Sequence, residues 1–402
     1  MTRTTRWGAL GALLAGAAAL AVLAVGTSGG FAAPTAKKKV IIGWAFDSSG
    51  NMAPFDNPAL AAARIRIKQI NAEKNGTVTF EIKTCDTQQN DGAKAKACAL
   101  SLLDAGANII FTTCDVDYAT PVVTEAINRG KLAIAPCIGT DQMGPKRFGA
   151  KGKLAFSFGN VAQDEGSAMA QYAWSRGWKT ANTATNTLLV YFKNVVQAFE
   201  KRFKQLGGKI VSRESYATGQ SNVGTAVTHL NSSKAAVNVT STAFGELPAF
   251  VNGLRSLHNN TPILNSWAGD GTYWTTNNPK VTNYYFVTYA SVFGDDPDKA
   301  VRKMIADLKK AGAQVGTGGF LGGVDAIDGV YIAIKRAHGS LNGTALANQL
   351  VKFKHVPVLG SRISFSPTQH TVFGRQYRVL KIQDNKAKVV GKVTAKVVPK
   401  LP

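Results

Sequence analysis

Residues 109–140 read IIFTTCDVDYATPVVTEAINRGKLAIAPCIGT, and this stretch decides the fold class. Its first apolar run, Ile109–Thr112, is followed by a helix signal that opens at Thr120-Pro121 and ends at Gly130, and a second apolar run covers Leu132–Ala135. Proline favours the first turn of a helix and glycine follows the last, so these residues bracket one helix. Apolar strands joined through a helix are typical of a parallel sheet covered on both faces. The stretch therefore predicts an α/β fold.

The same alternation continues in both directions from this stretch. Toward the N-terminus it predicts strands at 40–45 and 78–82, each followed by a helix. The alternation pauses near 156–160 and then starts again. Beyond this pause it predicts strands at 180–185, 210–212, 236–239, 263–264 and 284–288. The final part of the chain, 362–393, is predicted to be rich in β-strands. We therefore predict two doubly wound parallel-sheet lobes, with a ligand site where the carboxyl ends of their strands face each other.

The N-terminal segment differs from the rest of the chain. Arg3 and Arg6 precede an apolar run, Gly8–Val25, and a stretch of small residues, Gly26–Ala33. A positive, an apolar and a small-residue part in this order are typical of a secretory signal peptide, so we predict that residues 1–32 are cleaved and the protein is exported to the periplasm or cell surface. The apolar run is also about as long as a short membrane span, so an uncleaved anchor is the alternative.

The chain is strongly basic, with a formal net charge of +23 over 402 residues. Loss of Arg3 and Arg6 with the signal peptide leaves +21, which is 23 minus 2. A charge of this size can indicate nucleic-acid binding. Export argues against that partner, and lysines are enriched only at 37–39 and 381–400, without interleaved aromatic residues. We therefore predict a solvated basic surface and no nucleic-acid partner.

All four cysteines lie close together in the sequence, at Cys85, Cys98, Cys114 and Cys137. In an exported protein an even, clustered set indicates two disulfides. Cys85 ends a predicted strand and Cys98 lies in the next helix, so these two residues can pair. Cys114 and Cys137 end strands that would be neighbours in the sheet, which favours their pairing, and Cys85–Cys114 is the alternative. No Cys-x-x-Cys spacing occurs, so no metal site is predicted.

No catalytic motif stands out. Beyond residue 40 the sequence contains neither a Gly-x-Ser-x-Gly elbow nor a His-Glu-x-x-His helix, and the glycine-rich run Gly316–Gly323 lacks the spacing of a dinucleotide-binding loop. We therefore predict neither an enzyme nor a cofactor.

The loops that follow the predicted strands carry the candidate chemistry. Asp115 and Asp117 come after the third strand and suit an ammonium group or another cation, with helix capping by Asp117 as the alternative. The segment 136–141 brings backbone amides and a hydroxyl, which suit a carboxylate. The first loop, 46–56, offers hydroxyls, two carboxylates and an aromatic ring.

Several of these positions together resemble a known family. They are the Ser49-Gly50 turn with Phe55, Cys85-Asp86 before an alanine-rich helix, Pro121, and Ala135-Pro136. In order and spacing they resemble the branched-chain amino-acid-type solute-binding proteins of ABC transporters, which have the type I periplasmic-binding-protein fold. The resemblance covers 39–395.

The resemblance implies how the chain is divided and what it works with. It implies a first lobe of 38–158 plus 290–360, a second lobe of 159–289 plus 361–399, and a three-segment hinge that allows closure on a ligand. It also implies a small-molecule ligand, a membrane permease as partner, and a monomer.

The family's ligand-contacting positions can be carried over by their place in each loop. They give a candidate ligand site of Ser49, Phe55, Asp56, Asp115, Asp117, Tyr118, Ile138, Gly139, Thr140, Tyr191, Phe244, Trp267 and Asp270. Relatives hold a ligand carboxylate at the loops matching 115–117 and 138–140, and the acidic side chains at 115–117 here would repel it. We therefore expect a ligand with a cationic or hydrogen-bond-donating group on a planar body.

The function predicted from the sequence is an extracytoplasmic solute-binding protein of an ABC importer, which closes on a small polar molecule and delivers it to the permease. A ligand-sensing receptor without transport is one alternative. An exported enzyme on the same scaffold is the other.

Overall fold

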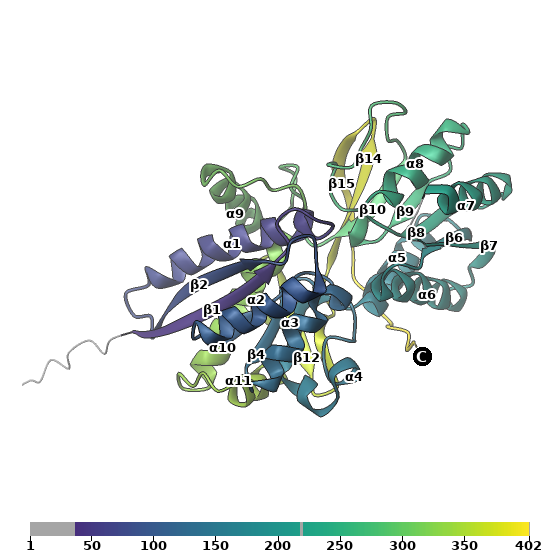
Figure 1. Cartoon of the computed structure of the whole chain (residues 1–402). Helices are drawn as coiled ribbons and strands as arrows, with labels where there is room; N and C mark the ends of the chain where they lie inside the picture. The colour runs from purple at the N-terminus through teal and green to yellow at the C-terminus, as the bar shows by residue number, and fades with distance from the viewer. Residues whose placement is uncertain (1–36, 218–219, 402) are drawn as a thin grey trace, which may run out of the picture. The chain divides into compact units, whose positions relative to one another are not determined.

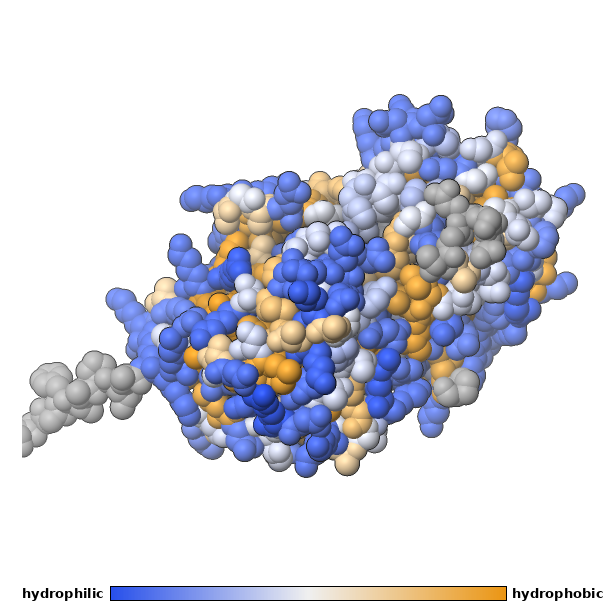
Figure 2. Space-filling view, viewed as in Figure 1, coloured by the Kyte–Doolittle hydropathy of each residue, from blue (hydrophilic) through white to orange (hydrophobic). Residues whose placement is uncertain are grey.

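The computed structural model describes residues 37–217 and 220–401. The predicted signal peptide lies outside these residues. Among the helices that are described, none is long and apolar enough to cross a membrane. Hydrophilic side chains cover much of the visible face, with apolar patches scattered between them (Figure 2).

The first sheet has eight strands in the order β11-β12-β13-β5-β4-β3-β1-β2. The five strands from the first part of the chain pair in parallel: β1 (Lys38–Phe46), β2 (Val78–Asp86), β3 (Ile109–Phe111), β4 (Leu132–Ala135) and β5 (Ala155–Asn160). β13 (Gln369–Phe373) then pairs in parallel with β5, and two antiparallel pairings add β12 (Ser361–Ser366) and β11 (Val356–Val358). Every residue of β3, β4 and β5 is buried, as expected for a sheet covered on both faces.

Helices cover this sheet in packed groups. α1 packs against α10, α2 packs against α3, and α10 also contacts α11. The bounds of the helices in this lobe are α1 (Ala53–Asn71), α2 (Gly92–Asp104), α3 (Val116–Asn128), α4 (Pro145–Phe148), the short 3₁₀ helix η1 (Gly149–Leu154), α9 (Lys299–Lys310), α10 (Phe320–Arg336) and α11 (Gly343–Leu350).

The second sheet has seven strands in the order β15-β14-β10-β9-β8-β6-β7. Its strands are β6 (Thr180–Asn186), β7 (Lys209–Tyr216), β8 (Val237–Ser241), β9 (Ile263–Asn265), β10 (Tyr284–Thr288), β14 (Tyr377–Gln383) and β15 (Lys386–Val393). The first five pair in parallel, whereas β14 and β15 are antiparallel. α5 packs against α6 and α7 against α8 (Figure 1). These elements are α5 (Ala162–Ser175), α6 (Val190–Gln205), α7 (Gln220–Ser232), α8 (Glu246–Ser256) and η2 (Trp267–Gly269).

The predicted fold class, two α/β lobes with mostly parallel sheets, is confirmed. One helix begins earlier than predicted: α3 starts at Val116, and not at Thr120-Pro121. The reason is that Asp115 caps it, because its side chain accepts hydrogen bonds from the backbone N–H groups of Asp117 and Tyr118. Pro121 therefore lies inside the helix.

The chain crosses between the two sheets three times: after β5, after β10 and after β13. The predicted boundary at 360/361 would give β12 and β13 to the second lobe, whereas both strands belong to the first sheet here. They stay with it because β12 continues the antiparallel pairing from β11, and β13 pairs with β5. The last crossing is therefore the short segment between β13 and β14.

Buried polar contacts join the three crossings. The Asn160 N–H donates to the Tyr289 hydroxyl (2.9 Å), which links the first crossing to the second. Arg375, in the third crossing, is fully buried and pairs with Asp325 of α10 (2.8 Å). Its guanidinium also donates to the Phe158 carbonyl (3.0 Å) and lies over the Tyr289 ring. The crossings thus share one buried network, in which the hydrogen bonds of Arg375 are charge-assisted.

A candidate ligand pocket at the strand ends

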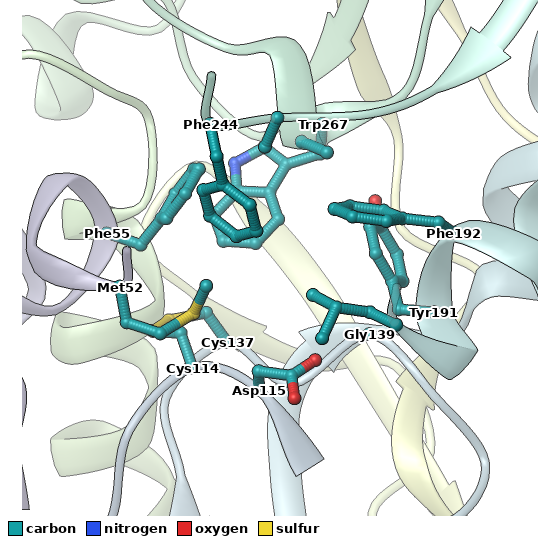
Figure 3. A pocket seen from close by; sticks show the side chains of 13 residues that line it. Met52, Phe55, Cys114, Asp115, Cys137, Gly139, Tyr191, Phe192, Phe244 and Trp267 are labelled. Carbon is teal, nitrogen blue, oxygen red and sulfur yellow. A yellow bond between two sulfur atoms is a disulfide. The ribbon is translucent and has the colours of Figure 1, made fainter. Parts of the chain in front are cut away.

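A pocket lies where loops from both sheets meet. It is narrow: the cavity volume is about 30 Å³, within about 350 Å³ of empty space that includes open solvent. Its walls come from the start of α1, from the loops after β3 and β4, and from the loops after β6, β8 and β9 (Figure 3). The lining residues are Met52, Phe55, Cys114, Asp115, Cys137, Gly139, Leu189, Tyr191, Phe192, Ala243, Phe244, Trp267 and Ala268.

Aromatic rings form much of this lining. The Phe55 and Trp267 rings are tilted against each other with their centroids 4.8 Å apart, and Trp267 stacks on Tyr289 behind it at 5.0 Å. On the other side Phe192 contacts Phe244, with centroids 6.0 Å apart. These spacings lie within the favourable range for aromatic pairs, so the rings hold one another in place. The pocket therefore has ordered aromatic walls.

Asp115 is the one carboxylate among the lining residues, and it is 4% exposed. Its Oδ1 accepts hydrogen bonds from the N–H groups of Asp117 (2.8 Å) and Tyr118 (3.4 Å), so it occupies the first amides of α3. Oδ2 accepts no hydrogen bond from the part of the chain that the structure describes. Burial, and secondly the charge of Asp117, raise the pKa of Asp115 to about 7. Figure 3 shows this carboxyl across the pocket from Phe244 and Trp267.

The Cys114–Cys137 disulfide also lines the pocket. It joins the loops after the neighbouring strands β3 and β4, with 4.8 Å between the two Cα atoms. The other disulfide is Cys85–Cys98, so the predicted pairings are confirmed and the alternative Cys85–Cys114 is not formed.

Tyr191 and Gly139 fit closely together. A Cβ atom at Gly139 would lie 2.6 Å from the Tyr191 ring, so only glycine leaves room for it. The Tyr191 hydroxyl donates to Glu165 Oε2 (2.9 Å), and Glu165 Oε1 accepts from the backbone N–H of Trp267. Burial raises the pKa of Glu165 to about 8. Glu165 therefore positions two aromatic walls from behind the pocket.

Three predicted acidic site residues do not line the pocket. Asp56 is fully buried and accepts from the N–H groups of Asp47 (2.8 Å) and Cys114 (2.9 Å), so it ties the first loop to the loop after β3. Burial raises the pKa of Asp56 to about 8. Asp270 accepts from the Thr288 hydroxyl (2.7 Å) and the Gly318 N–H (2.6 Å).

Asp117, the third of these residues, bridges the two lobes. It pairs with Arg147 (2.8 Å), and its Oδ2 accepts from the N–H of Val190 (3.4 Å), the first residue of α6. α6 has no side-chain cap of its own from Leu189, so a carboxylate from the first lobe interacts with this helix terminus.

The remaining predicted residues lie beside the pocket. Ser49 is exposed and Tyr118 is half-buried. The Ile138 side chain belongs to the core of the first lobe. Thr140 is buried, and its carbonyl accepts from the Thr371 hydroxyl (2.6 Å). The structure brings together Phe55, Asp115, Gly139, Tyr191, Phe244 and Trp267 from the predicted set.

Sequence reasoning missed several contributors, chiefly apolar ones. Met52, Leu189 and Phe192 lie in or beside loops already singled out, and Phe192 directly follows Tyr191, so their loop position was a usable signal. Glu165 carried no such signal, because it lies in a helix and its partners come from distant loops.

The described residues contain one close group of potential metal ligands, formed by Asp56, Cys114 and Cys137. The two sulfur atoms are joined in a disulfide, so they cannot bind a metal as thiolates.

Comparison with known proteins identifies the family of this chain. Residues 39–387 match the family model described as periplasmic binding protein. Comparison with curated proteins found no significant match.

Solved structures of similar fold come from several bacteria. The branched-chain amino acid transporter substrate-binding protein LivJ from Streptococcus pneumoniae, in complex with isoleucine, is 20% identical with a TM-score of 0.74, covering 90% of this chain and 100% of that one. The leucine-binding protein LivK from Thermotoga maritima is 16% identical with a TM-score of 0.76, covering 88% and 98%.

A solute-binding protein of an ABC transporter from Rhodopseudomonas palustris BisB5, in complex with 3,4-dihydroxybenzoic acid, is also 16% identical, with a TM-score of 0.74, covering 90% and 99%. Identities this low establish a common fold, and the family follows from the match over 39–387. The chain belongs to the periplasmic binding protein family.

Proposed function

We propose that this protein is the solute receptor of an ABC importer and that it holds a planar solute carrying a cationic or hydrogen-bond-donating group. The observation that carries the proposal is the aromatic pocket between the strand ends of the two sheets, with Asp115 as its one carboxylate. Ligands of open α/β sheets bind at the carboxyl ends of the strands. Aromatic walls favour a flat, apolar body.

The hydrogen bonds of Asp115 indicate which charged group of a solute the pocket favours. The amides of Asp117 and Tyr118 at the start of α3 would suit a ligand carboxylate, but Asp115 Oδ1 already accepts from both. Oδ2 accepts no hydrogen bond from the described residues, and Asp115 lines the pocket. A solute carboxylate would meet a buried carboxyl group, whereas an ammonium or N–H group would meet an acceptor.

Structures of similar fold supply a useful contrast. Isoleucine and 3,4-dihydroxybenzoic acid, the compounds bound by two of them, both carry a carboxylate. The aromatic lining of this chain agrees with a ring-bearing solute like the second compound. Asp115 argues against its acidic group.

A titration series tests the class of solute. The mature protein is titrated by calorimetry with tyramine, 4-hydroxybenzoate and isoleucine, after any solute that co-purifies has been released by denaturation and identified by mass spectrometry. We expect tyramine to bind and the two carboxylates to bind more weakly or not at all. Tighter binding of 4-hydroxybenzoate than of tyramine would contradict the proposal.

A matched pair of variants tests the role of Asp115. Asp115→Asn should weaken tyramine binding by about tenfold, which corresponds to about 1.4 kcal/mol. Asp104→Asn, an exposed residue of the same lobe, removes the same charge and should leave the affinity unchanged. Equal affinities for Asp115→Asn and the unaltered protein would exclude a cation bound at this carboxyl.

Export, delivery to a permease and a monomeric state complete the proposal. Uptake of the identified solute into proteoliposomes that contain the cognate permease and ATPase should require this protein. Mass spectrometry of the solute after prolonged incubation should show it unchanged, because the proposal is binding without turnover.

A further inference from the structure

The face of the second lobe beside β15 carries two adjoining grooves that share Tyr172. The first is lined by Tyr172, Arg176, Tyr285, Lys381, Gln383, Lys388 and Val390. The second is lined by Gln171, Tyr172, Trp174, Ser175, Arg202, Leu206, Lys392, Val393, Thr394 and Lys396. None of these residues lines the solute pocket.

Strand register places like charges side by side in the first groove. Lys381 of β14 is directly opposite Lys388 of β15, and on its other side it is opposite Tyr285 of β10. The Lys381 ammonium lies 5.6 Å from the centre of the Tyr285 ring. Like charges directly opposite in an antiparallel pair destabilise the sheet, so this arrangement opposes folding in the absence of an anion.

The six cations of the two grooves have no acidic partner in the described part of the chain. In the described ranges, 37–217 and 220–401, no ion pair involves Arg176, Arg202 or any of the four groove lysines, and no carboxylate is among the lining residues. Asp295, which accepts from the Val389 N–H, lines neither groove. The positive charge is thus left open to a partner.

Aromatic side chains from distant parts of the sequence lie in or beside the same grooves. Tyr172 contacts Tyr285 with ring centroids 6.3 Å apart, and Trp178 contacts Tyr285 at 5.3 Å. Trp174 belongs to the second groove. The lysine-rich segment 381–400 has no aromatic residues interleaved in the sequence, but the fold supplies them from α5 and β10.

We propose that these grooves bind an extended, phosphate-bearing polyanion. Lysine binds phosphate as a point charge and arginine binds it through paired N–H donors, and both occur here without competing carboxylates. Two concave grooves that meet at Tyr172 fit a chain better than the plane of a bilayer. The cations are complementary in charge to successive phosphate groups along such a chain.

The test uses long-chain inorganic polyphosphate as the probe and the whole mature protein. Its binding is measured by calorimetry at several salt concentrations for the unaltered protein, for the double variant Lys381→Gln/Lys388→Gln, and for a control, Lys309→Gln/Lys310→Gln. The control removes the same charge from exposed positions of α9 in the first lobe. We expect saturable binding that the groove variant weakens by roughly tenfold or more, with a salt slope shallower by about one for each lysine removed.

Measurements of thermal unfolding and of solute binding show whether the groove variant is still correctly folded. The groove variant should have an unchanged or higher Tm, because a like-charge pair is removed, and unchanged affinity for the solute of the pocket. The proposal is overturned if polyphosphate does not bind saturably, or if the control variant loses as much affinity as the groove variant. It is also overturned if the groove lysines affect binding to phosphatidylglycerol vesicles but not to polyphosphate, since a bilayer would then be the partner.

Discussion

The solute pocket and the basic grooves beside β15 both combine aromatic rings with charged groups, but the partners of those charges differ. In the pocket and at the crossings behind it, buried Asp115, Glu165 and Arg375 each have hydrogen-bond partners from the protein itself. In the grooves the cations have no acidic partner among the residues that the structure describes. Burial explains the difference, because an unpaired charge is tolerated in water and is costly inside a protein.

The largest effect should come from breaking a buried pair. Arg375→Ala leaves Asp325 buried without its partner, so we expect the free energy of unfolding to fall by about 3–5 kcal/mol. Urea unfolding followed by circular dichroism measures it. Lys388→Ala, in the exposed groove, is the matched comparison and should cause no measurable loss. A similar fall in unfolding free energy for both variants would contradict the claim that the buried charges depend on protein partners and the groove charges do not.

The next effect concerns the close fit of the pocket. Gly139→Ala places a methyl group against the Tyr191 ring, and overpacking of this kind costs about 1–3 kcal/mol. Gly92→Ala is the control, because nothing lies within 4 Å of its added Cβ. We expect a lower Tm and weaker solute binding for the first variant alone. Normal binding by Gly139→Ala would show that the Tyr191 wall is adaptable and not preformed.

The pH dependence of stability should reveal the buried carboxyl groups. Burial raises the pKa of Glu165 from 4.5 to about 8 in the folded protein, so between these values the unfolded chain is ionised while the folded protein keeps its proton. Its contribution to stability is therefore present at low pH and is lost as pH rises toward 8.

Glu165→Gln should reduce the difference in unfolding free energy between pH 5 and pH 8, measured in urea. Asp56 and Asp115 would continue to contribute in the same direction. An undiminished difference would mean that Glu165 is ionised when folded.

The smallest effect should come from the contact between lobes at Asp117. Asp117→Asn weakens the interaction with the N-terminus of α6, which is worth about 0.3–1 kcal/mol. Because this contact needs the lobes together and lies outside the pocket, affinity should fall by the same small factor for two uncharged solutes. Charged solutes are left out of the comparison, because the charge of Asp117 also raises the pKa of Asp115. Calorimetry with two uncharged solutes checks the prediction, and unequal changes for the two would contradict it.

Much of the fold could be predicted from the sequence because its signals are local. Apolar runs predicted the strands, and the residues that begin and end each helix predicted the helices between them. The ends of the predicted strands then identified the loops that form the pocket. Sheet membership of β12 and β13 could not be predicted, because it depends on pairing with β11 and β5, which no local pattern encodes.

The candidate site shows the same limit at the level of side chains. Asp115 and Asp117 are two residues apart in one loop, yet one lines the pocket and the other pairs with Arg147 and α6. A position in a loop fixes the edge of the sheet but not the direction of the side chain. The partners of Glu165, and the aromatic rings beside the groove lysines, come from elements far apart in the sequence.

The Cys114–Cys137 disulfide has a consequence for how the protein must be made. Its sulfur atoms form part of the pocket wall, so a chain produced in a reducing cytoplasm would present two separate thiols there and free the two loops from each other. Receptor folded in an oxidising compartment and receptor refolded without an oxidant should therefore differ in solute affinity even when their secondary structure is the same. The oxidation state of the preparation thus belongs among the conditions of every binding measurement.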